Sequence, residues 1–134
     1  MTATPALPEP QGSISLQTIA MPADTNWNGD IFGGWLVSQM DLAGAVLARR
    51  RARGRIATVA IDSMVFHQPV HVGDVLTCYT HFLRVGTTSM RVGIEVWETA
   101  DPERAPVKVT EGQFTYVAID DSGRPRPVPP ELAA

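Results

Sequence analysis

One long helical segment, followed only by segments of alternating pattern, limits the folds that this chain can adopt. In Trp35–Arg53 the apolar residues Leu36, Met40 and Leu47 recur at helical spacing, and Gly54 marks the end of the segment. Beyond it the hydrophobic period changes to two, which predicts four consecutive strands. These stretches are rich in valine, isoleucine, threonine and aromatic residues and span Arg55–Phe66, Val75–Val85, Thr88–Thr99 and Val107–Ile119.

The residues before the helix complete the fold class. Ser13–Ala20 alternates well enough for a first strand, and Met21–Gly34 is dense in asparagine, aspartate and glycine, which is typical of a loop. The order of strand, loop, helix and four strands predicts an α+β domain, in which one helix packs against the concave face of an antiparallel sheet. It excludes a doubly wound fold, because helices alternate with strands there.

Length and composition predict one domain with a tail at each end. The chain has 134 residues, of which 44% are hydrophobic and 19% are charged, so it carries enough apolar material for one core. Prolines concentrate in residues 1–12 and 120–134. We therefore expect a single domain at 13–119 between two flexible tails.

Charge and cysteine content exclude several classes of function. A net charge of −3 argues against a nucleic-acid partner. The single cysteine, Cys78, excludes an internal disulfide and a multi-cysteine metal site. Met1–Gln11 has neither the basic residues nor the apolar run of a signal peptide. We expect a soluble, cytoplasmic protein without a membrane partner.

The predicted helix is apolar on all sides. Asp41 is the only charged residue between Ile31 and Ala48, and Trp35 and Leu42 lie opposite the main apolar stripe. A helix of this kind is buried on every face, but one sheet covers one side only. A bilayer is a poor cover for the other side, because a carboxylate at its centre is costly. We therefore expect a second copy to cover it in a dimer.

Asp41 has a structural and a functional interpretation. A carboxylate at the edge of an apolar stripe must be hydrogen-bonded, paired or protonated, because burying it without a partner is expensive. It is then either a structural acid that binds a neighbouring strand or the partner copy, or a general base or nucleophile poised by partial desolvation.

The loop before the helix also has two interpretations. Asn26, Asn28, Gly33 and Gly34 are residue types that any helix entrance uses. Alternatively, the free N–H groups of the helix start stabilise a developing oxyanion, and an asparagine orients a water molecule or the carbonyl. The two glycines would let that carbonyl approach closely.

The distance along the helix joins these two pieces. Gly34 and Asp41 are seven residues apart, which is about 10 Å along one helix axis. One carbonyl group cannot contact both, because catalytic contacts need about 3 Å. Two helices laid antiparallel across a dimer interface would bring the start of one helix beside Asp41 of the other.

Several short motifs occur in a fixed order over residues 16–120. They are Met21–Asn26, Asn28–Trp35, Ser38–Asp41, Thr58–Ala60, Met64–Phe66, Pro69–Val70, Val72–Val75, Val85–Ser89 and Glu95–Trp97. With these motifs the sequence resembles the hot-dog-fold acyl-CoA thioesterases, close to their YciA-like branch. The run Asn-Gly-Asp-Ile-Phe-Gly-Gly, followed by Met-Asp, is the most specific part of the resemblance.

The resemblance implies a curved antiparallel sheet of five to six strands wrapped around one long helix. It also implies dimers joined edge to edge, which often assemble into a trimer of dimers, and hydrolysis of acyl-CoA to a free acid and coenzyme A. The family's helix carboxylate falls on Asp41, as general base or nucleophile. Its loop asparagine falls on Asn26 or Asn28, and the oxyanion donor would be the amide of Gly34.

The resemblance further implies where coenzyme A binds. The pantetheine arm would follow the strand that begins near Thr58 and includes Val59, and the nucleotide would lie near the hairpin of Ser89. Gly33 is expected to contact acyl-CoA because a glycine lets the thioester carbonyl approach closely. No metal or redox cofactor is implied. This chain departs from the family at Thr87, where the family often has arginine, and at Trp27, where it usually has a small residue or proline.

A run of arginines ends the predicted helix, and it also has two interpretations. It comprises Arg49, Arg50, Arg51, Arg53 and Arg55. The cations either form a solvated helix end that complements the helix dipole, or attract the phosphates of coenzyme A.

Two other functions compete with hydrolysis. A hot-dog hydratase or dehydratase would need a histidine near the helix start, and none of the three histidines lies there. A non-catalytic acyl-CoA binding or regulatory protein could use the same scaffold, since a fold does not fix a function.

Overall fold

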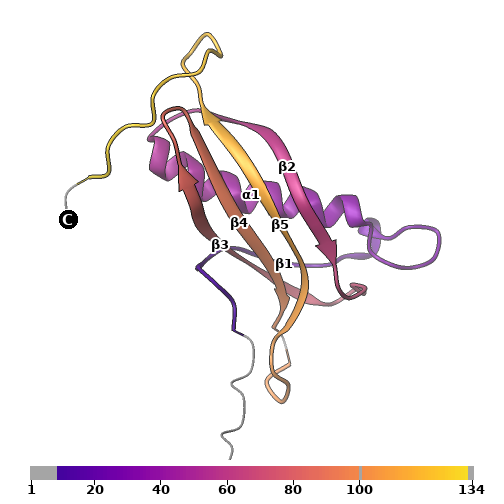
Figure 1. Cartoon of the computed structure of the whole chain (residues 1–134). Helices are drawn as coiled ribbons and strands as arrows, with labels where there is room; N and C mark the ends of the chain where they lie inside the picture. Colours follow the sequence, from indigo (N-terminus) through magenta and orange to yellow (C-terminus); the bar gives the residue numbers. More distant parts are fainter. Residues whose placement is uncertain (1–8, 100, 133–134) are drawn as a thin grey trace, which may run out of the picture.

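The computed structural model describes residues 9–99 and 101–132, in which one helix crosses one sheet (Figure 1). The helix α1 begins at Gly33, two residues earlier than expected, because the Phe32 carbonyl already accepts hydrogen bonds from Trp35 and Leu36. The elements are β1 (Ser13–Ile19), the 3-10 turn η1 (Pro22–Asp24), α1 (Gly33–Ala52), β2 (Ile56–Phe66), β3 (Val75–Val85), β4 (Ser89–Glu98) and β5 (Val107–Ala118).

The five described strands form one sheet in the order β1-β3-β4-β5-β2, and every neighbouring pair is antiparallel. The chain therefore crosses from β1 through α1 to the opposite edge of the sheet, where β2 lies. This confirms the α+β architecture with one antiparallel sheet and one long helix. Both β1 and β2 are edge strands, so one side of each has unpaired N–H and C=O groups.

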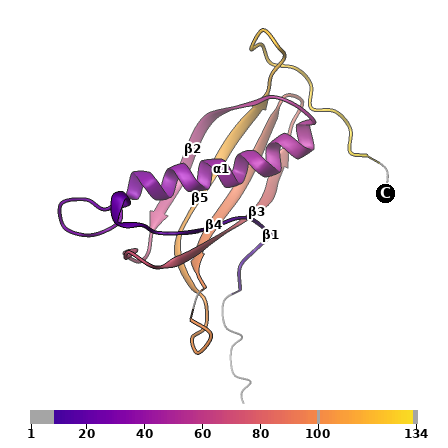
Figure 2. The ribbon, with the colours of Figure 1, turned by 180° about the vertical axis from the view of Figure 1, so that it is seen from behind.

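The helix lies on the concave face of the sheet and contacts all five strands (Figure 2). Its buried side consists of Leu36, Met40, Ala43, Gly44, Ala48 and Ala52. These residues pack on inward-facing side chains of the central strands, which include Val92, Ile94, Phe114 and Tyr116. The opposite side stays open within one chain, since Leu42 is 56% exposed. The sheet thus covers one side of the apolar helix, as the sequence predicts.

The proline-rich segment after β5 is hydrogen-bonded to the domain. The guanidinium group of Arg126 donates to the carbonyls of Ala52 and Ile119, both at 2.9 Å, and so caps the end of α1. The Val128 amide donates to the Thr87 carbonyl at 2.7 Å. The sequence predicts a loosely attached tail here, whereas the described part of this segment is hydrogen-bonded to the helix end and to the β3–β4 hairpin. Residues 1–8 of the other expected tail lie outside the described residues.

Gly44→Ala should destabilise the protein. A Cβ atom at this position would lie 2.2 Å from the Tyr116 hydroxyl oxygen and 2.7 Å from Ile94 Cδ1. We expect the free energy of unfolding to fall by about 1–3 kcal/mol, as is usual for overpacking. Denaturant unfolding measures it. Gly34→Ala is the matched control on the same helix, because a Cβ there meets open space. Equal losses in the two variants would contradict the role of Gly44.

Candidate active site on the central helix

The carboxylate of Asp41 is held by two hydroxyl groups. Thr58 Oγ1 donates to Asp41 Oδ1 at 2.7 Å. The Tyr116 hydroxyl lies 3.2 Å from the same oxygen and 2.9 Å from the Asp41 carbonyl, to both of which it can donate. Asp41 is half-buried. Among the residues that the structure describes, none binds Asp41 Oδ2, so one carboxylate oxygen is fixed and the other is available.

Strand register and a small helix residue create this arrangement. Thr58 and Tyr116 are direct partners in the β2–β5 ladder, so their side chains point to the same face of the sheet. That face is the one covered by α1. Gly44, one turn after Asp41, leaves the space that the phenol ring needs to reach the helix backbone. Three elements thus meet at one carboxylate.

Tyr116 is a hydrogen-bond donor and not an acid–base group. It is fully buried. Burial raises the pKa of the Tyr116 hydroxyl, and the neighbouring charge of Asp41 and its hydrogen bond raise it further. The phenol therefore stays protonated throughout the neutral range and continues to donate to Asp41.

The start of α1 is bare. Phe32 is its N-cap residue, and no side chain among the described residues caps the helix. Gly33 and Gly34 are exposed, and the space beyond Gly34 is open. The first N–H groups of a helix have no partner within it, so these amides can bind an oxyanion. The spacing of seven positions from Gly34 to Asp41 keeps this helix start about 10 Å from the carboxylate of the same chain.

Asn26 closes the loop before the helix. Its Oδ1 accepts hydrogen bonds from the amides of Asn28 at 2.9 Å and Asp30 at 3.1 Å. Its own amide donates to the Asp30 carbonyl at 2.7 Å. Asn28 is exposed at the loop tip. Within one chain, then, Asn26 shapes the loop and neither asparagine reaches Asp41.

The residues expected to bind coenzyme A lie at two ends of the sheet, with Gly33 at one end and the others toward the opposite end. Ser89 and Arg55 lie at the same end of the sheet, since Ser89 pairs with Val117 and the residue after Arg55 pairs with Ala118. Arg55 donates to the carbonyls of Asp120 and Asp121, at 3.2 and 3.0 Å. Thr58 binds Asp41, and Val59 is 57% exposed on the edge strand. Gly33 lies at the other end, beside Phe66.

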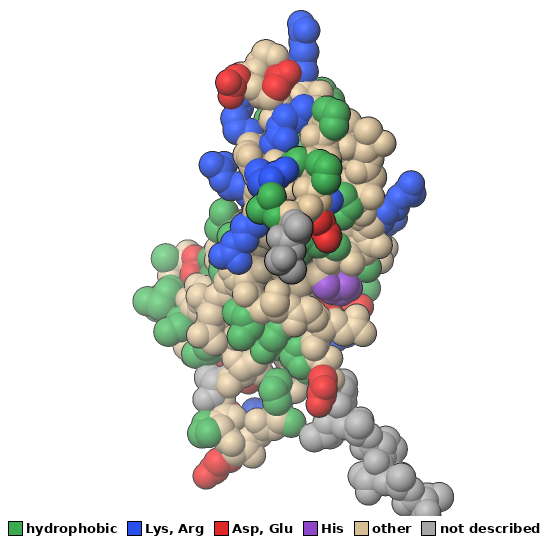
Figure 3. Space-filling view, turned by 90° about the vertical axis from the view of Figure 1, so that its left-hand side faces the viewer, with side chains coloured by type: hydrophobic (Ala, Val, Ile, Leu, Met, Phe, Trp, Pro, Cys, Tyr) green, Lys and Arg blue, Asp and Glu red, His purple; other side chains and the backbone are tan. Residues whose placement is uncertain are grey.

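The arginine run is partly used inside the chain. Arg51 donates to the Pro129 carbonyl, and Arg55 binds the turn after β5. Neither interpretation of this run anticipates these bonds, because they depend on where the C-terminal segment lies. Figure 3 shows basic side chains gathered in the upper half of the face on which the segment lies.

Tyr116 is the site residue that the sequence interpretation misses. It stands in an alternating row with Phe114 and Ala118 and so reads as ordinary core. The available signal is its hydroxyl, which needs a partner when the ring is buried. A glycine in the apolar stripe of the helix, Gly44, is the corresponding signal on the other side.

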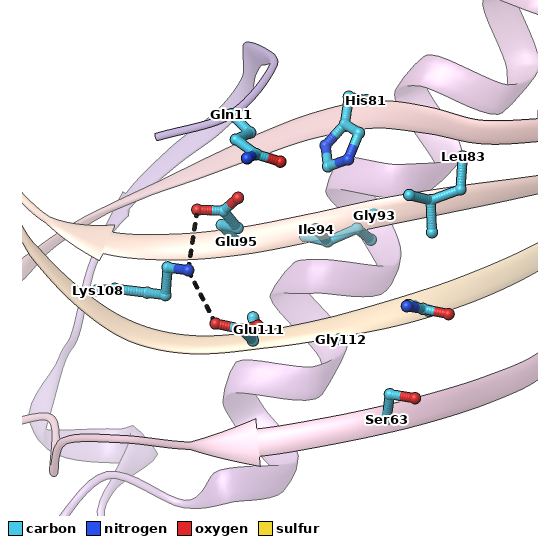
Figure 4. Close-up of a pocket in the computed structure, with 11 residues that line it drawn as sticks. Gln11, Ser63, His81, Leu83, Gly93, Ile94, Glu95, Lys108, Glu111 and Gly112 are labelled. Carbon is cyan, nitrogen blue, oxygen red and sulfur yellow. Dashed lines mark ion pairs between the residues drawn. The ribbon is translucent and has the colours of Figure 1, made fainter. Parts of the chain in front are cut away.

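A second polar cluster lies on the sheet face away from α1 (Figure 4). Lys108 Nζ bridges Glu111 at 2.9 Å and Glu95 at 3.5 Å, and the Trp97 indole donates to Glu95 at 3.0 Å. The cluster borders a polar cavity of about 280 Å³. All its charges are paired with one another, and His67 extends the chain of contacts at 3.0 Å from Glu111. This indicates a structural network on the outer face.

The other residues that carry chemistry do not assemble into a site. Cys78 is buried, and burial raises the pKa of its thiol to about 12, so it is a poor nucleophile. Among the described residues there is no group of three or more histidines, cysteines and carboxylates that could hold a metal ion. No helix in the described ranges has the length and hydropathy to cross a membrane.

Comparison with known proteins identifies the family. The thioesterase superfamily profile matches residues 28–105, more than half of the chain. This chain belongs to the thioesterase superfamily. It is 54% identical over 123 residues to the acyl-CoA thioester hydrolase YciA of Salmonella typhimurium, covering 90% of this chain and 92% of the relative. The expected hot-dog fold and the expected class of thioester hydrolases are thereby confirmed.

Two solved structures extend the comparison. The hexameric thioesterase y2039 of Yersinia pestis is 50% identical, with a TM-score of 0.86 and coverage of 92% of this chain and 100% of that chain. An acyl-CoA hydrolase of Staphylococcus aureus was solved with butyryl coenzyme A and coenzyme A. It is 30% identical, with a TM-score of 0.79, and the match covers 85% of this chain and 70% of that chain. Two alanine variants of that hydrolase were also solved, one at an aspartate and one at a threonine. The two substituted residues are 17 positions apart in its sequence, and Asp41 and Thr58 are 17 positions apart in this chain.

Cys78 should be unreactive in the folded protein. With a thiol pKa of about 12, roughly one part in ten thousand is thiolate at pH 8. We expect no reaction with the disulfide reagent DTNB under native conditions and one equivalent of released dye per chain in guanidinium chloride. Rapid native labelling would contradict the burial of this thiol.

Proposed function

We propose that this protein hydrolyses acyl-CoA thioesters to a free carboxylic acid and coenzyme A, in a site shared between two copies. The observation that carries the proposal is the Asp41 carboxylate, which is fixed through Oδ1 by Thr58 and Tyr116 and presents Oδ2 free. The names of the relatives and the match to the thioesterase superfamily support the substrate class.

The chemistry requires few groups. A thioester has a weakly basic thiolate leaving group, so water, a carboxylate and an oxyanion site suffice. As general base, Asp41 Oδ2 takes a proton from water while the water oxygen bonds to the carbonyl carbon. The carbonyl oxygen gains negative charge beside the helix amide of Gly34. Collapse then breaks the C–S bond and releases the thiolate, which takes up the proton. As nucleophile, Asp41 would bond to that carbon itself while the C–S bond breaks and the thiolate leaves. Water would then cleave the resulting anhydride, which releases the acid and restores the Asp41 carboxylate.

The second copy supplies the helix start. The edge strand β2 presents exposed apolar side chains, namely Val59, Ile61, Val65 and Phe66, with exposures of 42–57%. Two β2 edges joined antiparallel about Asp62 would place Phe66 of one copy beside Thr58 of the other. Because Gly33 lies at Phe66 and Asp41 at Thr58, the same pairing brings the helix start of one copy to the carboxylate of the other. Each dimer then has two equivalent sites.

The coenzyme A arm follows from this placement. From Thr58 the edge strand leads back through Ile56 to Arg55, and Ser89 lies at that same end. We propose that the pantetheine arm runs along Thr58 and Val59 and that the nucleotide lies toward this end. By analogy with the hexameric Yersinia pestis thioesterase, we propose that three dimers form the assembled protein.

Asp41→Asn should abolish turnover and spare the fold. The amide oxygen still accepts from Thr58 and Tyr116, but the group no longer acts as a base or nucleophile. We expect kcat to fall at least about 100-fold, with little change in coenzyme A affinity. Thiol release from acyl-CoA substrates of several chain lengths measures it. Glu103→Gln, an exposed loop residue, is the charge-matched control. Wild-type rates in Asp41→Asn, or saturable binding without any turnover in the wild type, would refute the proposal.

Thr58→Val should lower kcat more than it raises KM, because it removes the donor that orients Asp41 while keeping the side-chain volume. Loss of a hydrogen bond to a charged group costs about 1.5–3 kcal/mol, so we expect at least a tenfold loss in kcat. Thr58→Ser restores the hydroxyl and should recover most of it. If serine and valine behave alike, the hydroxyl does not position Asp41.

A further inference from the structure

Trp27 is a large apolar side chain presented to solvent by a closed loop. It is 94% exposed, yet its neighbours are fixed by the hydrogen bonds of Asn26 to Asn28 and Asp30. The ladder contact between Thr25 and Ile31 closes the base of the loop. The loop extends beyond the start of α1 (Figures 1 and 2). A rigid support for a bare indole indicates a contact outside the single chain.

An arginine hollow lies at the opposite end of α1. It has a volume of about 430 Å³ and is lined by Val46, Arg49, Arg50, Arg53 and Gly54. Unlike Arg51 and Arg55, the exposed Arg49 and Arg50 have no hydrogen-bond or ion-pair partner among the described residues. Guanidinium groups bind the faces of aromatic rings, and indole is the best of these.

The pairing in the proposed active site brings the two features together. In the proposed pairing, Gly34 of one copy lies beside Asp41 of the other and the two helices are antiparallel. Residues C-terminal to Asp41 on one helix then lie near residues N-terminal to Gly34 in the other chain. Arg49 lies eight residues beyond Asp41 on one helix, and the closed loop that carries Trp27 projects beyond the start of the other helix (Figures 1 and 2). In this pairing the hollow on one copy would face the Trp27 loop of the other.

The charges of the two surfaces are complementary. Residues 21–32 contain Asp24 and Asp30 and no basic residue, whereas the hollow contains three arginines. A second copy thus offers an indole for the guanidinium faces. It also offers two acidic side chains near the loop, of which Asp24 accepts from the Met21 amide and Asp30 lies 3.8 Å from His71 within its own chain. The exposed side chain of Leu42 lies on the same open side of α1, between the active site and the hollow.

We propose that Trp27 of each copy packs into the arginine hollow of its dimer partner. This inference rests on the pairing in the proposed function. It adds a contact that the shared-site geometry does not require, formed by the tryptophan of the Asn-Gly loop and the arginine run at the helix end.

Cross-linking tests the contact directly. In a Trp27→Cys/Arg50→Cys double variant, a short bismaleimide should join two chains and give a covalent dimer on a denaturing gel. A link within one chain is impossible, because the 17 residues from Gly33 to Arg50 span about 25 Å of helix. Each single variant should give no dimer, because equal positions lie at opposite ends of an antiparallel pair. Trp27→Cys/Leu83→Cys is the control, since Leu83 lies on the face away from α1 (Figure 4).

Self-association provides the second measurement. Trp27→Ala and Arg49→Ala should each raise the dimer dissociation constant at least tenfold in sedimentation equilibrium, and the double variant should add little to either. No cross-link, a ladder beyond the dimer, or unchanged dissociation constants would overturn the contact. So would a salt-sensitive rise in the KM for acyl-CoA in Arg49→Ala with unchanged association, which would assign the hollow to coenzyme A phosphates.

The outcomes separate this inference from the proposed function. A covalent dimer in a protein that does not hydrolyse acyl-CoA would support the contact and refute the activity. Asp41-dependent hydrolysis without a cross-link would support the activity and overturn the contact.

Discussion

The structure depends on one carboxylate held inside a helix–sheet interface. A charged group on the apolar helix would be costly if it were buried without partners. Thr58 and Tyr116 supply those partners from adjacent strands, and Gly44 supplies the space for the phenol. The register of β2 against β5 and the position of α1 over the sheet therefore determine each other at this point. The site and the core share the same contacts.

In the proposed function, a single chain holds only part of the catalytic machinery. Asp41 lies in the middle of α1, and the bare amides lie at its start, so the rigidity of the helix keeps them apart. The edge strand β2 and the outer side of the helix are also apolar and exposed within one chain. The proposed two-fold pairing would pair the open edge of β2, cover the exposed side of the helix and bring the helix start of one copy to Asp41 of the other. One contact between two copies would thus serve both folding and catalysis.

The C-terminal segment determines which arginines remain available. Arg126 caps the last turn of α1, Arg51 binds the segment itself, and Arg55 binds the turn after β5. These bonds satisfy carbonyl groups at the helix end and leave Arg49 and Arg50 facing outward. A run that is uniform in sequence is thus divided into cations with internal structural roles and cations that can meet a partner.

The sequence by itself determined the elements and the acid. Hydrophobic period, the glycine stop and the lone Asp41 predict the helix, the strands and the unusual carboxylate, because periodicity reports which face each segment buries. The strand order, the pairing of Thr58 with Tyr116 and the fastening of Arg126 were decided only by the tertiary structure. Hydrogen-bond partners distant in sequence carry no local signal, so Tyr116 looks like any core aromatic until β2 lies beside β5 under the helix.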